Sequence, residues 1–518
     1  CGQHQHDAVA GRGERGQVYA EHPFSGTRAG SGTGQPGSVA LGGCALRHGV
    51  EELDLGVVGG LHRLAQRDGP DHQGRQEDQD QDRQTEHEDG VQLVGQALAD
   101  RGKQLRRETG GHGRVEAQGA GTNVMHLIPH GSLRDQVMGS ADREPSEEEL
   151  AQMKQLAAKA MADGCWGMST GLIYVPGSYA QTDELVALSE VVAAAGGIYA
   201  SHMRNEGTEL LASTQELLEI GRRAGLPVHI SHFKSSGRDA WGLIREAARM
   251  VEEARASGQT VTADQYPYIA SSTSLDATVI PTWARAGGRK EMIARFDDAE
   301  QGPRIREQIA DKLSRKNEGE EIRIARYSPR PDWVSRNLKQ IAQDEKISPL
   351  EVCLQIARNG GAQIVNFSMR EEDVQFAMQL PWVATASDGR AALPAADRPH
   401  PRYYGTFARK IGHYAGAEGV LPLEQAIHSA SGLPAEIIGL KDRGRVAPEM
   451  FADVVVFDSK TYVDQATFDD PHRYAAGVRH VFVNGQPAVA DGIPTGALTG
   501  RPLRHVSPPA GDQSSAAP

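Results

Sequence analysis

The sequence predicts an α/β fold, a TIM-type (β/α)8 barrel, followed by a small β-sandwich toward the C-terminal end. From about residue 120, short apolar, β-prone runs alternate with amphipathic helices, which indicates parallel βαβ units. Several strands end in a polar residue, as barrel strands do on the face where an active site is built. No glycine-rich phosphate loop follows the first strand, which disfavours a doubly wound open sheet.

The first part of the chain differs from the rest in composition. Residues 1–115 contain no Met, Ile, Asn or Trp, and they include polar runs such as DHQGRQEDQDQDRQTEHEDG. Such a segment cannot bury enough apolar surface to offset its ordering entropy. Residues 1–118 are therefore predicted to be disordered, or to be a wrong-frame reading without functional information.

The alternation of strands and helices can be followed along residues 119–435, which are assigned to the barrel. A capping box, with Ser146 as N-cap and Glu149 three residues later, marks the start of the first helix. The predicted strands lie in 121–131, 165–174, 196–202, 226–232, 259–273 and 381–389, and the helices in 146–164, 182–197, 207–225 and 239–258. The first two barrel strands of the usual eight are expected to be missing or altered, because residues 1–118 do not supply them.

Two further regions flank or interrupt this alternation. The charged segment 283–345 separates a strand from the next helix, and we expect it to form an inserted subdomain or lid. In residues 436–504, β-prone runs surround Asn-Gly and Asp-Gly turns, as in antiparallel hairpins, which predicts the β-sandwich. The tail 505–518 is predicted to be disordered.

Polar residues are expected where six strands end: His130, Ser169, His202, His232, Asp264 and Asp388. Two of these ends are built alike, since GGIYASHMRNEG and LPVHISHFKSSG each run from an apolar strand through Ser-His into a polar loop. Imidazoles at the ends of adjacent parallel strands lie about 5 Å apart in backbone, so His202 and His232 could bind one zinc ion. Asp388 could then serve as a ligand and as a general base for metal-bound water. His229 lies in mid-strand and is expected to be structural.

These segments resemble the D-aminoacylase, or N-acyl-D-amino-acid deacylase, family of the amidohydrolase superfamily. The resemblance covers about residues 121–504. It rests on the stretches NVMHLIPHGSLR, GMSTGLIYVPGSYAQTDEL, GGIYASHMRNEG, VHISHFKSSG, VTADQYPY, HPRYYGTFAR, DRGRVAPEMFADVVVFD and GVRHVFVNGQPAVADG. It implies zinc-dependent hydrolysis of the amide in an N-acyl-D-amino acid, which releases a carboxylate and a D-amino acid.

The resemblance also implies roles for individual residues. His202 and His232 match the family's zinc-binding histidines, and Asp388 matches its catalytic aspartate. Lys234 matches a lysine near the substrate, and Arg402 looks like the clamp for the amino-acid carboxylate, a task suited to a bidentate guanidinium. Family substrate contacts are further matched by Tyr174, Tyr266 and Ser272.

The sequence departs from the family in its metal-binding motifs. A His-x-His strand and an Asn-Cys-Gly strand normally precede the matched region. HQHD at residues 4–7 and Cys44 lack the required strand context and lie too far upstream, and Cys165 is expected to be a core residue. Two alternatives therefore stand beside the deacylase: a cyclic-amide hydrolase such as a hydantoinase or dihydroorotase, and a catalytically incompetent product.

The composition also bears on partners and location. The formal net charge of −13 argues against nucleic-acid binding. No apolar run is long enough for a transmembrane helix, and the first residues show no signal-peptide pattern. The four scattered cysteines are typical of a reduced compartment. A cytoplasmic enzyme acting on a small molecule, without membrane or nucleic-acid partners, is expected.

Overall fold

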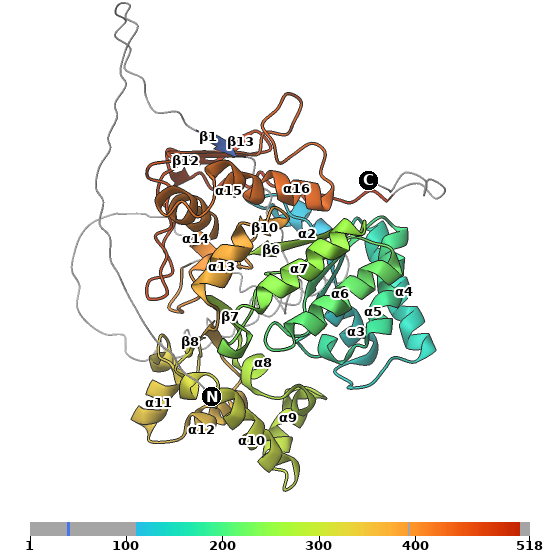
Figure 1. Cartoon of the computed structure of the whole chain (residues 1–518), viewed down its shortest axis with the longest axis vertical. Helices are drawn as coiled ribbons and strands as arrows, with labels where there is room; N and C mark the ends of the chain where they lie inside the picture. The colour runs from blue at the N-terminus through green and yellow to red at the C-terminus, as the bar shows by residue number, and fades with distance from the viewer. Residues whose placement is uncertain (1–38, 42–109, 392–393, 508–518) are drawn as a thin grey trace, which may run out of the picture. The chain divides into compact units, whose positions relative to one another are not determined.

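The computed structural model describes residues 39–41, 110–391 and 394–507 (Figure 1). The chain divides into Cys1–Gly37, which lies outside the described residues, and a second compact unit, Ser38–Pro518. Most of the segment predicted to be disordered or wrong-frame, residues 1–118, also lies outside. Two elements of that segment are described, strand β1 (Val39–Leu41) and helix α2 (Gly110–Gln118).

A parallel sheet forms the centre of the molecule. Its strand order is β10-β6-β5-β4-β3-β2, and all neighbouring strands run parallel. The strands are β2 (Ile128–Pro129), β3 (Gly167–Gly171), β4 (Ile198–His202), β5 (Val228–Ile230), β6 (Val261–Gln265) and β10 (Val383–Thr385). Within the described residues the sheet has six strands.

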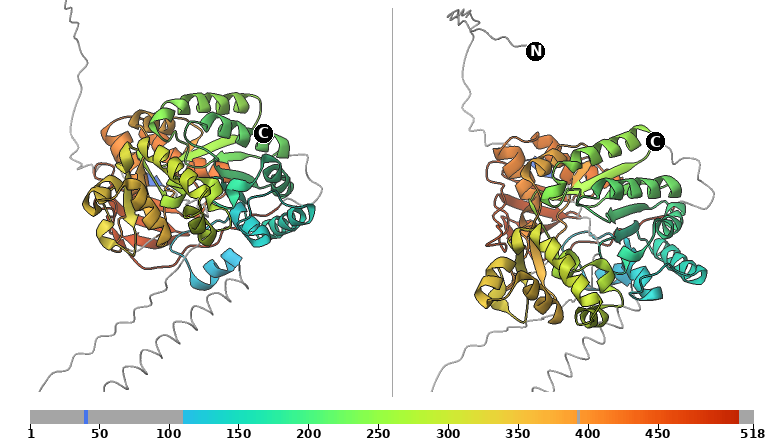
Figure 2. Two further views of the ribbon diagram at one scale, coloured as in Figure 1. Left: turned by 90° about the horizontal axis from the view of Figure 1, so that it is seen from below. Right: turned by 60° about the horizontal axis from the view of Figure 1, so that its bottom comes forward.

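The helices between these strands line one side of the sheet. They are α3 (His130–Met138), α4 (Glu147–Ala162), α5 (Thr182–Ala194), α6 (Leu210–Ala224) and α7 (Leu243–Ala256). Each packs against the next in the chain (Figures 1 and 2). In a doubly wound sheet, consecutive helices lie on both faces, so this arrangement is that of a barrel wall.

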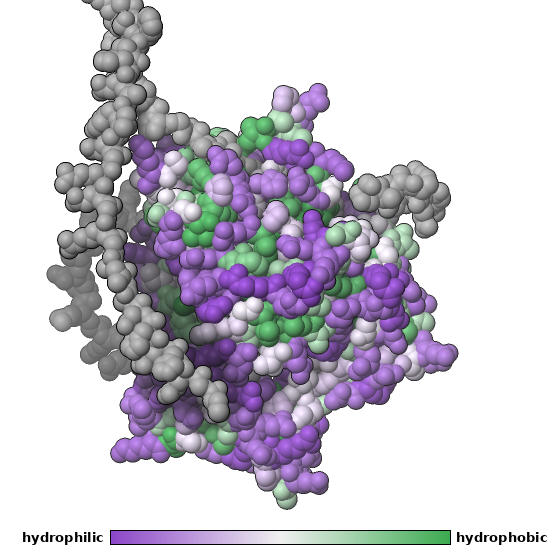
Figure 3. All heavy atoms as spheres, in the orientation of Figure 1, coloured by the Kyte–Doolittle hydropathy of each residue, from purple (hydrophilic) through white to green (hydrophobic). Residues whose placement is uncertain are grey.

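Local signals in the sequence explain where these helices begin and end. Ser146 and Glu149 form the predicted capping box at the start of α4. Gly225 ends α6 in the left-handed conformation, which a glycine adopts without steric cost. The apolar faces of the helices pack on the strands in one continuous core. Figure 3 shows mainly hydrophilic side chains on the outside, with hydrophobic ones in small patches.

The inserted segment is larger than the predicted range 283–345. It contains an antiparallel sheet, β7 (Ala270–Ser274), β9 (Gln363–Phe367) and β8 (Ile322–Arg326), in that order. Its helices are α8 (Leu275–Val279), α9 (Arg289–Phe296), α10 (Gln301–Ser314), α11 (Leu338–Glu345) and α12 (Pro349–Arg358). A separate core of buried residues between Leu275 and Ile364 holds it together. The segment is therefore a subdomain with its own core.

The C-terminal β region is an antiparallel sheet with the order β1-β11-β12-β13-β14. Its strands from this region are β11 (Val454–Phe457), β12 (Val478–Val483), β13 (Gln486–Ala490) and β14 (Ile493–Pro494). Both predicted turns are confirmed, because Asn484-Gly485 and Asp491-Gly492 connect these strands with positive φ angles. The helices before it are α13 (Glu371–Met378), α14 (Arg402–Ala408), the π-helix η6 (Arg409–Ala417), α15 (Leu423–Ala430) and α16 (Gly432–Ile438).

Over the described residues, no helix has the length and apolar character that crossing a bilayer would require.

A buried amine in η6 leads to a stability prediction. Lys410 is 1% exposed, and its Nζ has no hydrogen-bond partner among the described residues. Burial lowers the pKa of Lys410 from 10.5 to about 7. Because the unfolded chain binds this proton more tightly, the stability of the protein falls as pH decreases from 10.5 to about 7. Lys410→Met should therefore raise the free energy of unfolding at pH 7 by about 4 kcal/mol.

The gain should shrink to about half of that value at pH 9, because the free-energy cost of removing the Lys410 proton on folding falls as the pH approaches 10.5. Urea unfolding of both proteins at pH 7 and pH 9 measures it. Lys441→Met, at an exposed position, is the matched control and should change stability by less than about 0.5 kcal/mol. A pH-independent effect of Lys410→Met would contradict this account.

Candidate active site

The two Ser-His segments bring their imidazoles together at one edge of the sheet. His202 is the last residue of β4, and His232 follows the neighbouring parallel strand β5. His202 Nδ1 lies 2.7 Å from His232 Nε2, and the ring centroids are 4.4 Å apart. The expected proximity of the two histidines is confirmed.

Asp264 of β6 fixes the position of His232. Its Oδ1 accepts a hydrogen bond from the backbone N–H of His232 at 2.6 Å, and its Oδ2 lies 2.9 Å from His229 Nε2. Alternation along a strand would place His229 and His232, three residues apart, on opposite faces, yet both contact Asp264. The chain leaves strand geometry after Ile230, with a φ of +42° at His232, so alternation no longer applies and one carboxylate reaches both residues.

Two buried charged residues complete the surroundings of the histidines. Glu206, in the loop after β4, places Oε1 2.8 Å from His232 Nδ1 and Oε2 3.9 Å from His202 Nε2. Lys234 Nζ donates to Glu206 Oε1 and lies 2.7 Å from His232 Nδ1. Lys234 thus contacts the histidine cluster through Glu206 and His232. Glu206 was not singled out from the sequence, although a carboxylate four residues after a strand-end histidine in a polar loop was an available signal.

This cluster has the donor set of a metal site. His202, Glu206 and His232 each offer a ligand atom, and these atoms lie within 4.8 Å of one another. His202 Nε2 is buried without a hydrogen-bond partner in the described part of the chain, which leaves one imidazole nitrogen for a ligand. Burial lowers the pKa of His202 to about 3, against the opposing charge of Glu206. The imidazole is therefore neutral at pH 7, as metal binding requires.

Asp388 and Arg402 meet in a second cluster beside the histidines. Arg402 Nη2 lies 2.9 Å from Asp388 Oδ2, and the guanidinium carbon lies 4.5 Å from the centroid of the Tyr266 ring. The charge of Asp388 raises the pKa of His202, although burial outweighs it. Asp388 has a φ of +45°, so it shares with His232 a conformation that costs free energy and recurs at functional sites.

Arg402 retains capacity to bind an anion. It is 4% exposed, and its Nε and Nη1 make no hydrogen bond of standard geometry in the described structure. Nη2 also donates to the main-chain carbonyl of Ser272, at 3.4 Å. Tyr174 closes the other side, with its ring 5.5 Å from that of His202 and its hydroxyl 2.9 Å from Thr273 Oγ1. All eight predicted site residues thus lie around the histidine pair and the Asp388–Arg402 pair.

His130, Ser169 and Cys165, which were also singled out from the sequence, lie outside these two clusters. His130 Nε2 lies 2.8 Å from Glu184 Oε1, in a buried ion-pair cluster with Arg134. Ser169 is buried within β3. Cys165 packs against the main core, and burial raises the pKa of its thiol to about 11. Residues 4–7 and Cys44 lie outside the described residues.

Comparison with known proteins identifies the family. The model of the amidohydrolase family matches residues 117–489. D-aminoacylase of Alcaligenes xylosoxydans xylosoxydans is 36% identical over 400 residues, which cover 76% of this chain and 72% of that protein. The chain belongs to the D-aminoacylase family of amidohydrolases.

Two further members of the D-aminoacylase family extend the comparison. N-acyl-D-glutamate deacylase of the same organism is 36% identical over 393 residues, covering 76% of this chain and 72% of that protein. The crystal structure of N-acyl-D-glutamate deacylase from Bordetella bronchiseptica, with zinc and a phosphonate inhibitor, superposes with a TM-score of 0.63 at 32% identity, covering 76% of this chain and 74% of that one. The predicted family and barrel fold are therefore confirmed.

Proposed function

We propose that this protein hydrolyses the amide bond of N-acyl-D-amino acids and releases a carboxylate and a D-amino acid. The observation that carries the proposal is the position of Arg402. Its guanidinium lies beside the histidine pair, with Nε and Nη1 buried and without a hydrogen bond of standard geometry to the described residues. A planar, bidentate donor of this kind suits the α-carboxylate of an amino acid. The scissile amide of a substrate held there faces His202 and His232.

We infer a metal site from His202, His232 and Glu206, because catalytic zinc takes three protein ligands of these types. Zinc held there would polarise the amide carbonyl and lower the pKa of the attacking water. In this assignment Glu206 supplies the third ligand, and Lys234 positions Glu206 and His232 through its contacts with both.

Asp388 is the proposed proton carrier. In the structure it is paired with Arg402, so the substrate carboxylate must share or take over this guanidinium, which releases Asp388 toward the reacting atoms. Asp388 then accepts a proton from the attacking water and delivers it to the amine nitrogen as the C–N bond breaks. Tyr174, Tyr266 and Ser272 would orient the substrate around Arg402.

We also propose that the enzyme is located in the cytoplasm.

The proposal predicts activity on one enantiomer of a linear substrate. Purified protein supplied with Zn²⁺ should release free amine from N-acetyl-D-leucine and at least about a hundredfold less from N-acetyl-L-leucine. With its carboxylate at Arg402 and its amide at the histidines, the L-enantiomer must exchange the positions of its side chain and its Cα hydrogen, so it cannot be held in the same reactive geometry. Hydantoin and dihydroorotate serve as comparison substrates. Faster opening of these rings would favour the cyclic-amide alternative. Failure on every substrate would favour the incompetent product.

A further inference from the structure

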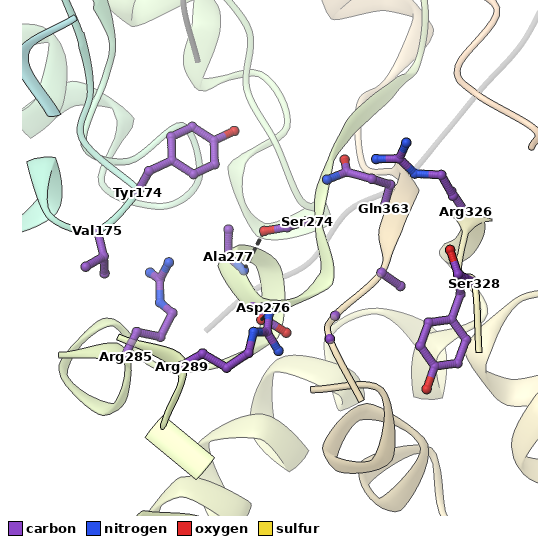
Figure 4. A pocket seen from close by; sticks show the side chains of 14 residues that line it. Tyr174, Val175, Ser274, Asp276, Ala277, Arg285, Arg289, Arg326, Ser328 and Gln363 are labelled. Carbon is purple, nitrogen blue, oxygen red and sulfur yellow. Dashed lines mark hydrogen bonds and ion pairs between the residues drawn. The ribbon is translucent and has the colours of Figure 1, made fainter. Parts of the chain in front are cut away.

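A cavity of about 530 Å³ lies between the end of β3 and the inserted subdomain (Figure 4). It is lined from one side by the loop after β3, including Tyr174, and from the others by the region after β7 and by the ends of β8 and β9. None of the residues proposed to bind metal lines it. The cavity is therefore a space next to the metal site rather than the metal site itself.

Tyr174 is the wall that the two sites share. Its ring lies 5.5 Å from the ring of His202 and also lines the cavity. Its hydroxyl lies 2.9 Å from Thr273 of β7, so the loop after β3 and the subdomain meet at this point. Tyr174 therefore connects the surroundings of His202 with the cavity.

The lining of the cavity is cationic. Three arginines contribute to it, Arg285, Arg289 and Arg326, against one carboxylate, Asp276. Asp276 lies 2.7 Å from Arg289 Nη2 and balances that charge. Arg326, at the end of β8, is exposed, and its guanidinium makes no hydrogen bond or ion pair with the side chain of another described residue, although its backbone pairs with Gln363 in the sheet. An excess of fixed positive charge inside a concave site attracts an anionic group.

One glycine preserves this arrangement. A Cβ at Gly361 would lie 2.8 Å from Arg289 Nη2 and 3.3 Å from Asp276 Oδ2, and Gly361 has a φ of +79°. Any side chain at this position would displace the Arg289–Asp276 pair and would also strain the backbone. The turn before β9 thus leaves room for a charged pair at the floor of the cavity.

We propose that this cavity binds a second carboxylate of the substrate, and that Arg326 is the residue that selects for it. The carboxylate can belong to an acidic D-amino-acid side chain or to the far end of a dicarboxylic acyl group, since both present the same anion. This inference rests on the proposed deacylase function and extends it to the substrate class. Arg326 is suited to this role because its guanidinium is not engaged by another described residue.

The test compares three substrates on the holoenzyme: N-acetyl-D-glutamate, N-succinyl-D-leucine and N-acetyl-D-leucine. The wild type should show a higher kcat/KM for one of the two dicarboxylates than for N-acetyl-D-leucine. Arg326→Gln should lower the ratio of kcat/KM for this dicarboxylate to kcat/KM for N-acetyl-D-leucine about tenfold, as expected for losing one solvent-exposed, charge-assisted hydrogen bond. The matched control is Arg323→Gln, on the same strand, whose guanidinium pairs with Asp469 outside the cavity, and it should leave the ratio unchanged.

A loss confined to N-acetyl-D-glutamate assigns the cavity to the side chain, and a loss confined to N-succinyl-D-leucine assigns it to the acyl group. Equal ratios in Arg326→Gln and wild type, or no preference for either dicarboxylate in the wild type, would overturn the inference. Calorimetric titration with glutarate separates it from the proposed function. If the protein hydrolyses none of the substrates but binds glutarate in a way that depends on Arg326, the cavity assignment stands and the deacylase is rejected. If it hydrolyses N-acetyl-D-leucine but does not bind glutarate, the cavity assignment is rejected and the deacylase stands.

Discussion

His202→Ala is expected to lose bound zinc and to lower kcat/KM for N-acetyl-D-leucine by about a thousandfold or more. Removing a hydrogen-bond partner of a metal ligand already costs about 10- to 100-fold, and His202 is proposed to bind the metal directly through its buried Nε2, which makes no hydrogen bond with the described residues. Glu206 and His232 would remain, and two ligands hold zinc far more weakly than three. Elemental analysis after dialysis gives the metal content independently of turnover.

His480→Ala is the matched control, since this histidine lies on β12 and is 38% exposed in its side chain. It should retain zinc and activity. Circular dichroism and a thermal melt establish that His202→Ala is folded, because an alanine at a buried position leaves a cavity. A folded His202→Ala protein that keeps both stoichiometric zinc and wild-type kcat/KM would refute the assigned metal site.

Asp388→Asn is expected to lower kcat by about a hundred- to ten-thousandfold, the range for losing a general acid–base group, while zinc content stays at the wild-type level. Asparagine preserves the shape of the side chain and an oxygen that can accept from Arg402. KM should therefore change much less than kcat. The acidic limb of the kcat profile, which reports the protonation of the base, should disappear.

Asp397→Asn provides the comparison for this variant. Asp397 pairs with His472 and is 27% exposed in its side chain, close to the 29% of Asp388. Asp397→Asn should keep kcat within about twofold of the wild-type value, as is usual for substitutions away from reacting groups. If Asp388→Asn instead raises KM and leaves kcat unchanged, Asp388 acts by holding Arg402 and is not the proton carrier.

Much of the fold could be predicted because its signals are local. The Ser146–Glu149 capping box, the αL glycine after α6 and the two hairpin turns in the C-terminal sheet all depend on a few neighbouring residues. The alternation of strands and helices predicted parallel βαβ units, which the sheet order confirms. The extent of the inserted subdomain was underestimated, because β7 and β9 pair across a long sequence separation, and their pairing has no local signal.

For the site, the sequence by itself determined that two histidines end neighbouring parallel strands, since strand order and strand ends follow from the periodicity of the chain. The parts that depended on tertiary structure are those built from long-range contacts. Asp264 reaches both His229 and His232 only because the chain turns after β5. Asp388 and Arg402 pair through a loop conformation with a positive φ. The arginines of the cavity come from segments far apart in the chain. Packing of the subdomain brings them together, and hydrophobic periodicity along the sequence does not predict this packing.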